Sequence, residues 1–279
     1  MDGLLLLNKE ANMTSHDLVN VVRKSIEQKK VGHTGTLDPN ATGLMILALG
    51  KATKLVSYLQ TDTKEYIVEM KLGILTDTLD IWGEVLKEES FTKPSEKEFK
   101  NVLKTFIGKQ KQKPPMYSAV RYKGQKLYKL ARKGETVDVP LREIEIEDIE
   151  LLEYNENIKL KINCSSGTYI RVICLDIAKK LNTVGVMTSL IRTKIGDFKL
   201  EEAYDIDSLK KGNYELASID KALKRYPVVH YNNISDIING RKIEIETNHD
   251  LVLIKVDNKA LAFYKREKDN LFRSKRGLW

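Results

Sequence analysis

The stretch VGHTGTLDPNATGLMILALGKATKL, from Val31 to Leu55, places one carboxylate, Asp38, in a loop rich in glycine and threonine. An apolar run, Leu44–Leu49, follows this loop and predicts a buried strand. Loops held by a rigid scaffold often carry functional groups, and small neighbouring residues let a bulky substrate approach closely. The alternative interpretation is that Asp38 and the proline after it only begin a turn, as this dipeptide often does.

The charge of the chain is unevenly distributed. The 279 residues include 47 Lys and Arg against 39 Asp and Glu, which gives a net charge of +8. Residues 104–134 contain ten basic residues, no acidic residue, and Tyr117, Tyr122 and Tyr128, whereas residues 135–156 contain nine acids and one arginine. A basic segment with aromatic residues suits a phosphate backbone and exposed bases. The alternative is a solvated face whose tyrosines lie in the core.

The two cysteines, Cys164 and Cys174, form no CxxC pair and have no histidine nearby, so a zinc site is not expected. They are predicted to be small buried residues in a reduced cytosol. No apolar stretch reaches transmembrane length, and Leu4–Leu7 is too short for a signal sequence. The sequence therefore predicts a soluble cytoplasmic protein.

The pattern of apolar residues predicts an α+β fold with a mainly antiparallel sheet flanked by helices, because strand pairs occur without crossover helices. Strands are expected at residues 3–8, 44–49, 64–72, 81–87, 116–122, 137–152, 158–164, 184–195, 251–256 and 260–264. Residues 81–87 are expected to pair with 64–72 as a hairpin. Helices are expected at 15–26, 52–59, 96–106, 125–132 and 168–181, two of them after capping boxes.

The organisation predicted is a large domain of residues 1–225 and a small C-terminal domain of residues 226–279. The large domain contains a basic segment at about 104–134, which is expected to clamp RNA. The boundary is expected near Pro227, after a polar helical stretch. The tail is short for an independent core. Its last 25 residues hold eight basic and three acidic groups.

The segment GHTGTLDPNATGLMILALGKATK resembles the catalytic signature of the TruB family, the bacterial tRNA pseudouridine synthases that modify uridine 55 in the T arm. Other family-like segments are Leu4–Lys9 with Thr14 and Ser15, Lys64–Tyr66, Pro114–Val120, Ser166–Arg171 and Leu190–Thr193. The first of these departs from the family pattern, since Asn8, Glu10 and Asn12 stand where Asp, Pro and Gly are common. The resemblance implies a pseudouridine synthase fold with a compact C-terminal β-rich domain of the PUA type.

The activity implied by this resemblance is isomerisation of uridine to pseudouridine, with Asp38, Tyr66 and Arg192 as catalytic residues. Arg192 would keep Asp38 ionised, and Tyr66 would stack on the extruded uracil. Alternatively, Tyr66 is a cross-strand core aromatic and Arg192 an ordinary arginine at the end of a strand. An internal rearrangement requires no metal or cofactor, and the sequence has no Walker loop or metal-spaced cluster. Whether Asp38 attacks the sugar or the base stays open.

The expected partner is the T arm of tRNA, bound by a monomer without an obligate protein partner or a membrane. The resemblance assigns His33 to the space that the target base vacates. Tyr169 and Arg171 either bound the pocket or only pack and pair. The remaining predicted RNA contacts are basic residues of the clamping segment, namely Lys109, Lys111, Lys113, Lys126 and Lys129. Two other functions considered are an RNA-folding chaperone and a hydrolase with an aspartate nucleophile; the latter would need a second acid or base near Asp38.

Overall fold

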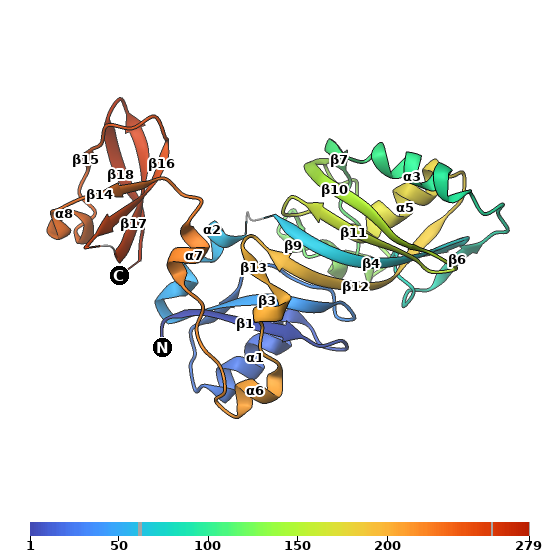
Figure 1. Cartoon of the computed structure of the whole chain (residues 1–279), viewed down its shortest axis with the longest axis horizontal. Coiled ribbons are helices and arrows are strands. Elements are labelled where there is room, and N and C mark those ends of the chain that lie inside the picture. Colours follow the sequence, from blue (N-terminus) through green and yellow to red (C-terminus); the bar gives the residue numbers. More distant parts are fainter. Residues whose placement is uncertain (61–62, 258, 279) are drawn as a thin grey trace. The chain divides into compact units, whose positions relative to one another are not determined.

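The computed structural model describes residues 1–60, 63–257 and 259–278. The chain forms two compact units, each built from separate stretches of sequence (Figure 1). Unit 1 comprises Met1–Pro39, Gly43–Thr61 and Gly196–Trp279, and unit 2 comprises Asn40–Thr42 and Asp62–Ile195. The predicted site residues therefore fall on both units, and each unit is described by itself.

The first sheet of unit 1 is centred on β3 (Thr42–Leu49), which pairs antiparallel with β1 (Gly3–Lys9) and with β2 (Val31–His33). Both β1 and β3 are almost wholly buried, which explains why they are continuous apolar runs without alternation. Helix α1 (Ser15–Ser25) begins at the predicted capping box, in which the side chains of Thr14 and Asp17 each bond the other's backbone N–H.

Short elements complete the N-terminal part of unit 1. The helix expected at residues 52–59 begins as a 3₁₀ helix, η1 (Gly50–Leu55), and continues into α2 (Val56–Leu59). Later in the chain come β13 (Phe198–Lys199), η2 (Leu200–Glu202), α6 (Ile206–Lys210) and α7 (Ile219–Leu223). The backbone N–H of Asn8 donates to Tyr204 and that of Ala217 donates to Leu4, so this stretch follows β1.

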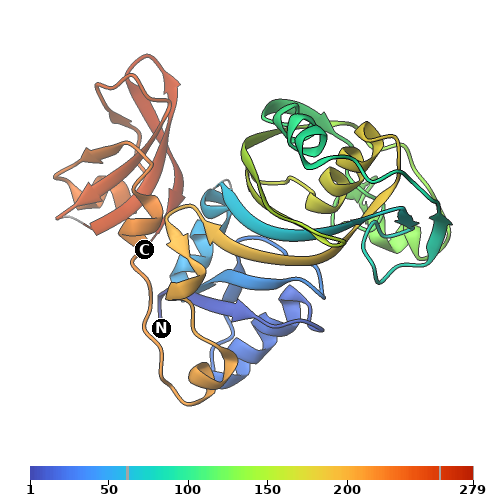
Figure 2. The same cartoon turned by 45° about the vertical axis from the view of Figure 1, so that its right-hand side comes forward.

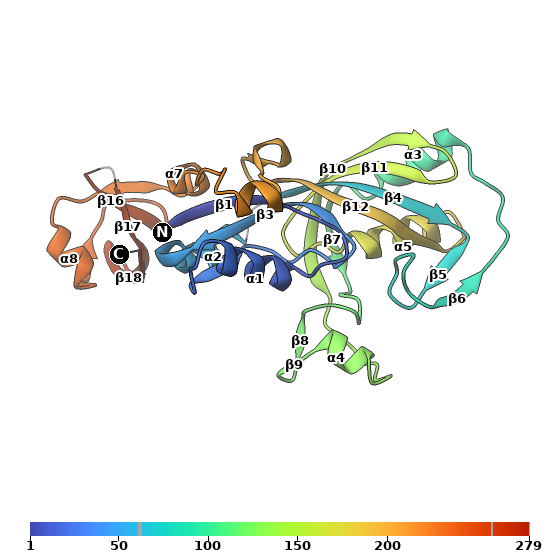
Figure 3. The same cartoon turned by 90° about the horizontal axis from the view of Figure 1, so that it is seen from below.

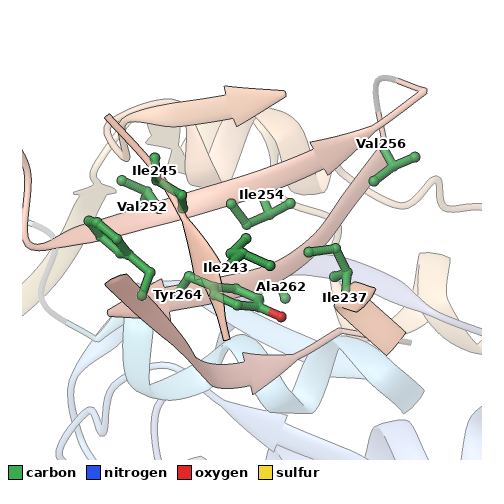
Figure 4. Close-up of a cluster of buried hydrophobic side chains, with 9 residues drawn as sticks. Ile237, Ile243, Ile245, Val252, Ile254, Val256, Ala262 and Tyr264 are labelled. Atoms are coloured by element: carbon green, nitrogen blue, oxygen red, sulfur yellow. The ribbon is translucent and has the colours of Figure 1, made fainter. Parts of the chain in front are cut away.

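The C-terminal part of unit 1 is a five-stranded sheet in the order β14-β16-β17-β18-β15. Its elements are β14 (Val228–His230), α8 (Ile234–Ile238), β15 (Ile243–Glu244), β16 (Leu251–Val256), β17 (Lys259–Lys268) and β18 (Leu271–Gly277). Aliphatic side chains, Tyr264 and Phe272 form its core (Figure 4). The ring of Tyr58 in α2 stacks on Phe263 with 3.8 Å between centroids, which joins this sheet to the N-terminal part. Independent folding of residues 226–279 stays a prediction.

Unit 2 is built on antiparallel strands in the order β12-β4-β11-β10-β7. These are β4 (Lys64–Leu72), β7 (Gly108–Gln112), β10 (Arg142–Tyr154), β11 (Ile158–Cys164) and β12 (Gly185–Ile195). Burial alternates along β4 and β11, so one face of each strand points into the core. Helices α3 (Glu96–Lys104) and α5 (Ile170–Lys180) pack against this sheet (Figure 2).

Two small hairpins are attached to unit 2. One pairs β5 (Ile74–Thr76) with β6 (Val85–Glu88). The other pairs β8 (Arg121–Tyr122) with β9 (Gln125–Lys126) and leads into α4 (Leu127–Ala131). Figure 3 shows the second hairpin and α4 projecting from the sheet of unit 2. They belong to the basic segment, residues 104–134, and have a small core of Val120, Leu127, Leu130 and Val139.

One predicted strand pairing and the extent of one predicted strand are wrong. Residues 81–87 do not pair with β4, because β11 and β12 occupy both edges of β4; instead, β6 pairs with β5. Gly73, with φ of +86°, turns the chain between β4 and β5. The strand expected at 116–122 is reduced to Arg121–Tyr122, since Ser118 donates back to the Met116 carbonyl in a turn.

Candidate active site

The loop that carries Asp38 is tied to the start of α1. Ser15 Oγ accepts a hydrogen bond from the Leu37 N–H at 2.8 Å and donates one to the Leu37 carbonyl at 3.1 Å. Ser15 is 2% exposed, so these bonds are shielded from water. The peptide groups of the residue before Asp38 are thus held by one buried side chain.

A buried lysine holds the other side of the same loop. Lys9, at the end of β1, is 0% exposed. Its Nζ donates to the carbonyls of Glu10 at 2.8 Å, Met13 at 2.8 Å and Pro39 at 2.9 Å. An ammonium group has three donors, and three carbonyl acceptors offset the cost of burying its charge. Since Pro39 follows Asp38, the backbone is fixed on both sides of the half-buried carboxylate.

Sequence reasoning missed Lys9 and Ser15 as supports of the site. Both lie in the N-terminal family-like segments, but nothing local predicts which loop they would hold. The sequence does show Lys9 at the end of an apolar strand, and a charged residue buried there requires hydrogen-bond partners. His33, the other predicted residue of unit 1, is half-buried on β2 opposite Leu47. Its contact with RNA stays a prediction.

In unit 2 the sheet brings Tyr66 and Arg192 together. They are directly opposite each other in the register of β4 and β12, and their side chains are hydrogen-bonded. Arg192 is 1% exposed and Tyr66 is also buried. Burial lowers the pKa of the Arg192 guanidinium below its ordinary value, and the Tyr66 hydroxyl acts in the opposite direction. Arg192 is therefore no surface arginine, although it lies near the end of a strand.

A second buried arginine of unit 2, Arg171, lies in the first turn of α5. Its guanidinium donates to the carbonyls of Thr78 at 2.7 Å and Tyr117 at 2.9 Å, and approaches the Asp80 carboxylate to 3.7 Å. Asp80 is itself held by Thr78, whose hydroxyl donates to its carboxylate at 2.7 Å. These contacts fix the Arg171 guanidinium inside unit 2, and whether it also bounds the pocket stays a prediction. Sequence reasoning missed Asp80, which lies in a loop between β5 and β6.

Tyr169, the N-cap residue of α5, is half-buried. Its ring packs against the small core of the basic segment, formed by Val120, Leu127, Leu130 and Val139. Gln112, at the end of β7, contacts the Tyr169 backbone through both atoms of its amide. Tyr169 and Arg171 are therefore both connected to the basic segment, through Gln112 and Tyr117.

The five predicted RNA-binding lysines fall into two groups with different neighbours. Lys109 and Lys111 are exposed on β7 but lie opposite Glu145 and Glu143 in the register of β10. Lys113 forms an ion pair of 2.6 Å with the exposed Asp138.

The second group lies at α4, where the Nζ of Lys126 stands 5.6 Å from the centroid of the Tyr128 ring. Lys129, in the same helix, is exposed. Residues 104–134 contain no acid, so the charge of this second group is not offset within its own segment.

Among the described residues, no group of three or more His, Cys, Asp or Glu side chains is arranged to hold a metal ion. No helix within residues 1–60, 63–257 and 259–278 combines the length and apolar character needed to cross a membrane. Both cysteines are free and buried, and burial raises the pKa of the Cys164 thiol to about 11 and that of Cys174 to about 12. Neither is a thiolate near neutral pH.

Comparisons with known proteins point to one family. The family model described as TruB family pseudouridylate synthase (N terminal domain) matches residues 23–170. The chain is 41% identical over 260 residues to the tRNA pseudouridine synthase B of Caldanaerobacter subterraneus subsp. tengcongensis, covering 92% of this chain and 91% of that protein. It is 38% identical over 280 residues to the tRNA pseudouridine synthase B of Mesoplasma florum, covering 99% and 97% of the two chains.

Solved structures resemble the fold. A chain in a Cbf5–Nop10–Gar1 complex is similar with a TM-score of 0.74 and 24% identity, covering 99% of this chain and 85% of that one. A chain in an H/ACA ribonucleoprotein bound to a substrate RNA containing 2′-deoxyuridine is similar with a TM-score of 0.73 and 23% identity, over the same shares. At this identity the likeness concerns the fold alone, and the predicted fold class is confirmed.

The support that Ser15 gives to the Asp38 loop can be tested by a matched pair of substitutions in α1. Ser15→Ala leaves the buried Leu37 N–H and carbonyl without that partner and should lower the free energy of unfolding by about 2 kcal/mol. Ser25→Ala, at the exposed end of the same helix, should change it by less than about 0.5 kcal/mol. Urea titrations followed by circular dichroism measure both, and equal values would contradict a special role for Ser15.

Proposed function

The chain belongs to the TruB family of pseudouridylate synthases, and on that premise we propose that it isomerises uridine 55 in the T loop of tRNA to pseudouridine. The observation that carries this proposal is the agreement with relatives named tRNA pseudouridine synthase B over 92% and 99% of this chain. The family model itself spans Asp38 and Tyr66. The proposed enzyme acts as a cytoplasmic monomer, and its reaction involves no cofactor.

The proposed reaction is an internal rearrangement of one nucleotide. The bond between N1 of uracil and C1′ of ribose breaks, the base turns, and a bond forms between C5 and C1′. The proton on C5 leaves, and N1 gains a proton, so the atoms balance without an oxidant or reductant. The nucleotide must leave its stack to expose C1′, which costs a few kcal/mol. RNA recognition by loop shape and unstacked bases suits a folded T arm.

Asp38 is proposed as the nucleophile, or as the group that stabilises a cationic sugar. Supporting this role, Ser15 and Lys9 fix the backbone on both sides of it. A catalytic group that is already held in place loses little conformational entropy when the substrate binds, and this lowers the barrier to reaction. Asp38 is half-buried, so it is partly accessible to a substrate.

Tyr66 and Arg192 are proposed to act on the same nucleotide. The Tyr66 ring offers a face on which uracil can stack, and its hydroxyl can exchange a proton. A guanidinium stays protonated and can bind a carboxylate through two parallel bonds, so Arg192 would keep Asp38 ionised after water is excluded. The hydrogen bond between Tyr66 and Arg192 supports their acting as a pair.

Arg171 is the alternative partner for Asp38, and one observation favours it. Its guanidinium is buried, fixed by two backbone carbonyls, and near one carboxylate already, that of Asp80. Both arginines thus meet the physical requirement for the role, and they must be separated by experiment.

The decisive measurement for the activity is release of tritium from a tRNA transcript labelled at C5 of uracil, without added metal or cofactor. The wild type should release the label at the T-loop uridine, and Asp38→Asn should abolish release while leaving the Kd for tRNA within about twofold, because the amide cannot act as a nucleophile. Turnover by Asp38→Asn would overturn the assignment of Asp38. Binding without release by the wild type would instead favour an RNA-binding protein, such as a chaperone.

The two arginines can be compared by the same substitution. If Arg192 partners Asp38, Arg192→Lys should lower the single-turnover rate by about 100-fold, because lysine is a point charge that cannot bind a carboxylate through two parallel bonds. Arg171→Lys should then have the smaller effect. The reverse order would transfer the role to Arg171. Circular dichroism of both variants checks that their folds are retained.

We expect substitutions in the two groups of lysines to change the salt dependence of RNA binding by different amounts. Replacing Lys126 and Lys129 by glutamine should reduce the slope of log Kd against log salt by about 1.5 to 2, as expected for two lost phosphate contacts. The same replacement of Lys109 and Lys111 should have a smaller effect, because these residues face Glu145 and Glu143. An equal change in both variants, or none in either, would contradict binding through α4.

A further inference from the structure

A short strap, residues 112–117, lies within the basic segment between β7 and the β8–β9 hairpin, and it is joined at both ends to the start of α5. At its first residue, Gln112 Oε1 accepts from the Tyr169 N–H at 2.8 Å, and Gln112 Nε2 donates to the Tyr169 carbonyl at 3.1 Å. At its last residue, the Tyr117 carbonyl accepts from the Arg171 guanidinium at 2.9 Å. The two joints therefore reach residues that are only two positions apart in the chain.

The first joint depends on the chemistry of a primary amide. One acceptor and one donor group meet the N–H and the carbonyl of a single residue, as a paired strand would do. Gln112 is 4% exposed, so a lost bond leaves buried polar groups unsatisfied. Glutamate has the same length but lacks the donor when ionised, and methionine has neither group.

Tyr169 is the point from which α5 starts. Its own side chain makes no capping bond, and its carbonyl also accepts from the N–H groups of Val172 at 3.1 Å and Ile173 at 3.2 Å. Gln112 thus holds the peptide groups that set the first turn of the helix. A shift of the Tyr169 backbone would displace Arg171, two residues later.

The middle of the strap borders a cavity. Pro114, Pro115 and Met116 line this cavity of about 290 Å³, together with residues of α5 that include Leu175 and Asp176. Met116 also packs against the small core of the basic segment. The strap is therefore held by its two joints and by Met116, while its side toward the cavity lacks the close contacts of a packed core.

The basic segment reaches Tyr169 by a second route. The Tyr169 ring packs against the small core of Val120, Leu127, Leu130 and Val139, which lies within and just after that segment. RNA bound at α4 would therefore act, through this core, on Tyr169, the same residue that Gln112 holds.

We infer that Gln112 is a positioning residue, which sets Tyr169 and Arg171 for the reaction. This inference rests on the proposed function, in which Arg171 is the alternative partner of Asp38, and it takes Tyr169 as a residue that bounds the pocket. Gln112 itself contacts no reacting atom. Its effect should therefore appear in the rate of the chemical step and not in the affinity for RNA.

Gln110 provides a matched control. It lies two residues earlier on β7, and its Nε2 also donates to a backbone carbonyl, that of Phe106 at 2.7 Å, but it does not join the strap to α5. The test compares Gln112→Glu with Gln110→Glu in full-length protein, using single-turnover tritium release and the Kd for the tRNA transcript. Gln112→Met repeats the test without introducing a charge, should the first variant fail to fold.

The expected result is a loss of about 10- to 100-fold in the single-turnover rate for Gln112→Glu, with Kd within about twofold of the wild type and a smaller loss for Gln110→Glu. Equal losses in the two variants, or a loss confined to Kd, would overturn the inference. An inactive wild type would contradict the proposed function instead, so the two failures are distinguishable.

Discussion

The bonds from Ser15 and Lys9 to the backbone around Asp38 are the constraint on which the arrangement of unit 1 depends. A loop has no neighbouring strand to satisfy its peptide groups, so a side chain must do so or the loop must stay solvated. Ser15 can serve because the capping box of Thr14 and Asp17 starts α1 at that residue. Lys9 can serve because β1 ends there, beside the turn that supplies two of its three acceptors.

In unit 2 a sheet and two contacts between a side chain and the backbone hold the chain in place. The register of β4 and β12 sets Tyr66 opposite Arg192 without any loop, because strand pairing fixes which side chains share a face. Where the chain leaves the sheet at Gln112, side chains again replace the ladder: Gln112 pairs with the Tyr169 backbone, and Arg171 pairs with Tyr117. The predicted site residues of both units are thus held by buried polar groups whose loss is costly.

Strands with alternating burial were predictable from sequence to the residue, since β4 and β11 begin and end where the alternation does. Their partners were not, because alternation does not tell which edge of a strand is already occupied; β6 was therefore assigned to β4 instead of β5. The site residues came from resemblance, but their supports did not. The bond from Lys9 to Pro39 spans 30 residues and that from Gln112 to Tyr169 spans 57, and no local pattern encodes such contacts.

The same dependence on register explains why a basic segment is followed by an acidic one. The acids of β10 face lysines of both neighbouring strands: Glu143 and Glu145 lie opposite Lys111 and Lys109, and Glu150 and Glu153 pair with Lys161 and Lys159. Antiparallel pairing therefore neutralises charge within the sheet, where like charges would repel. Lys126 and Lys129, at α4, belong to residues 104–134, a segment that contains no acidic residue to face them. A chain that is basic overall can in this way concentrate its field at one projecting element, which is what the binding of a polyanion favours.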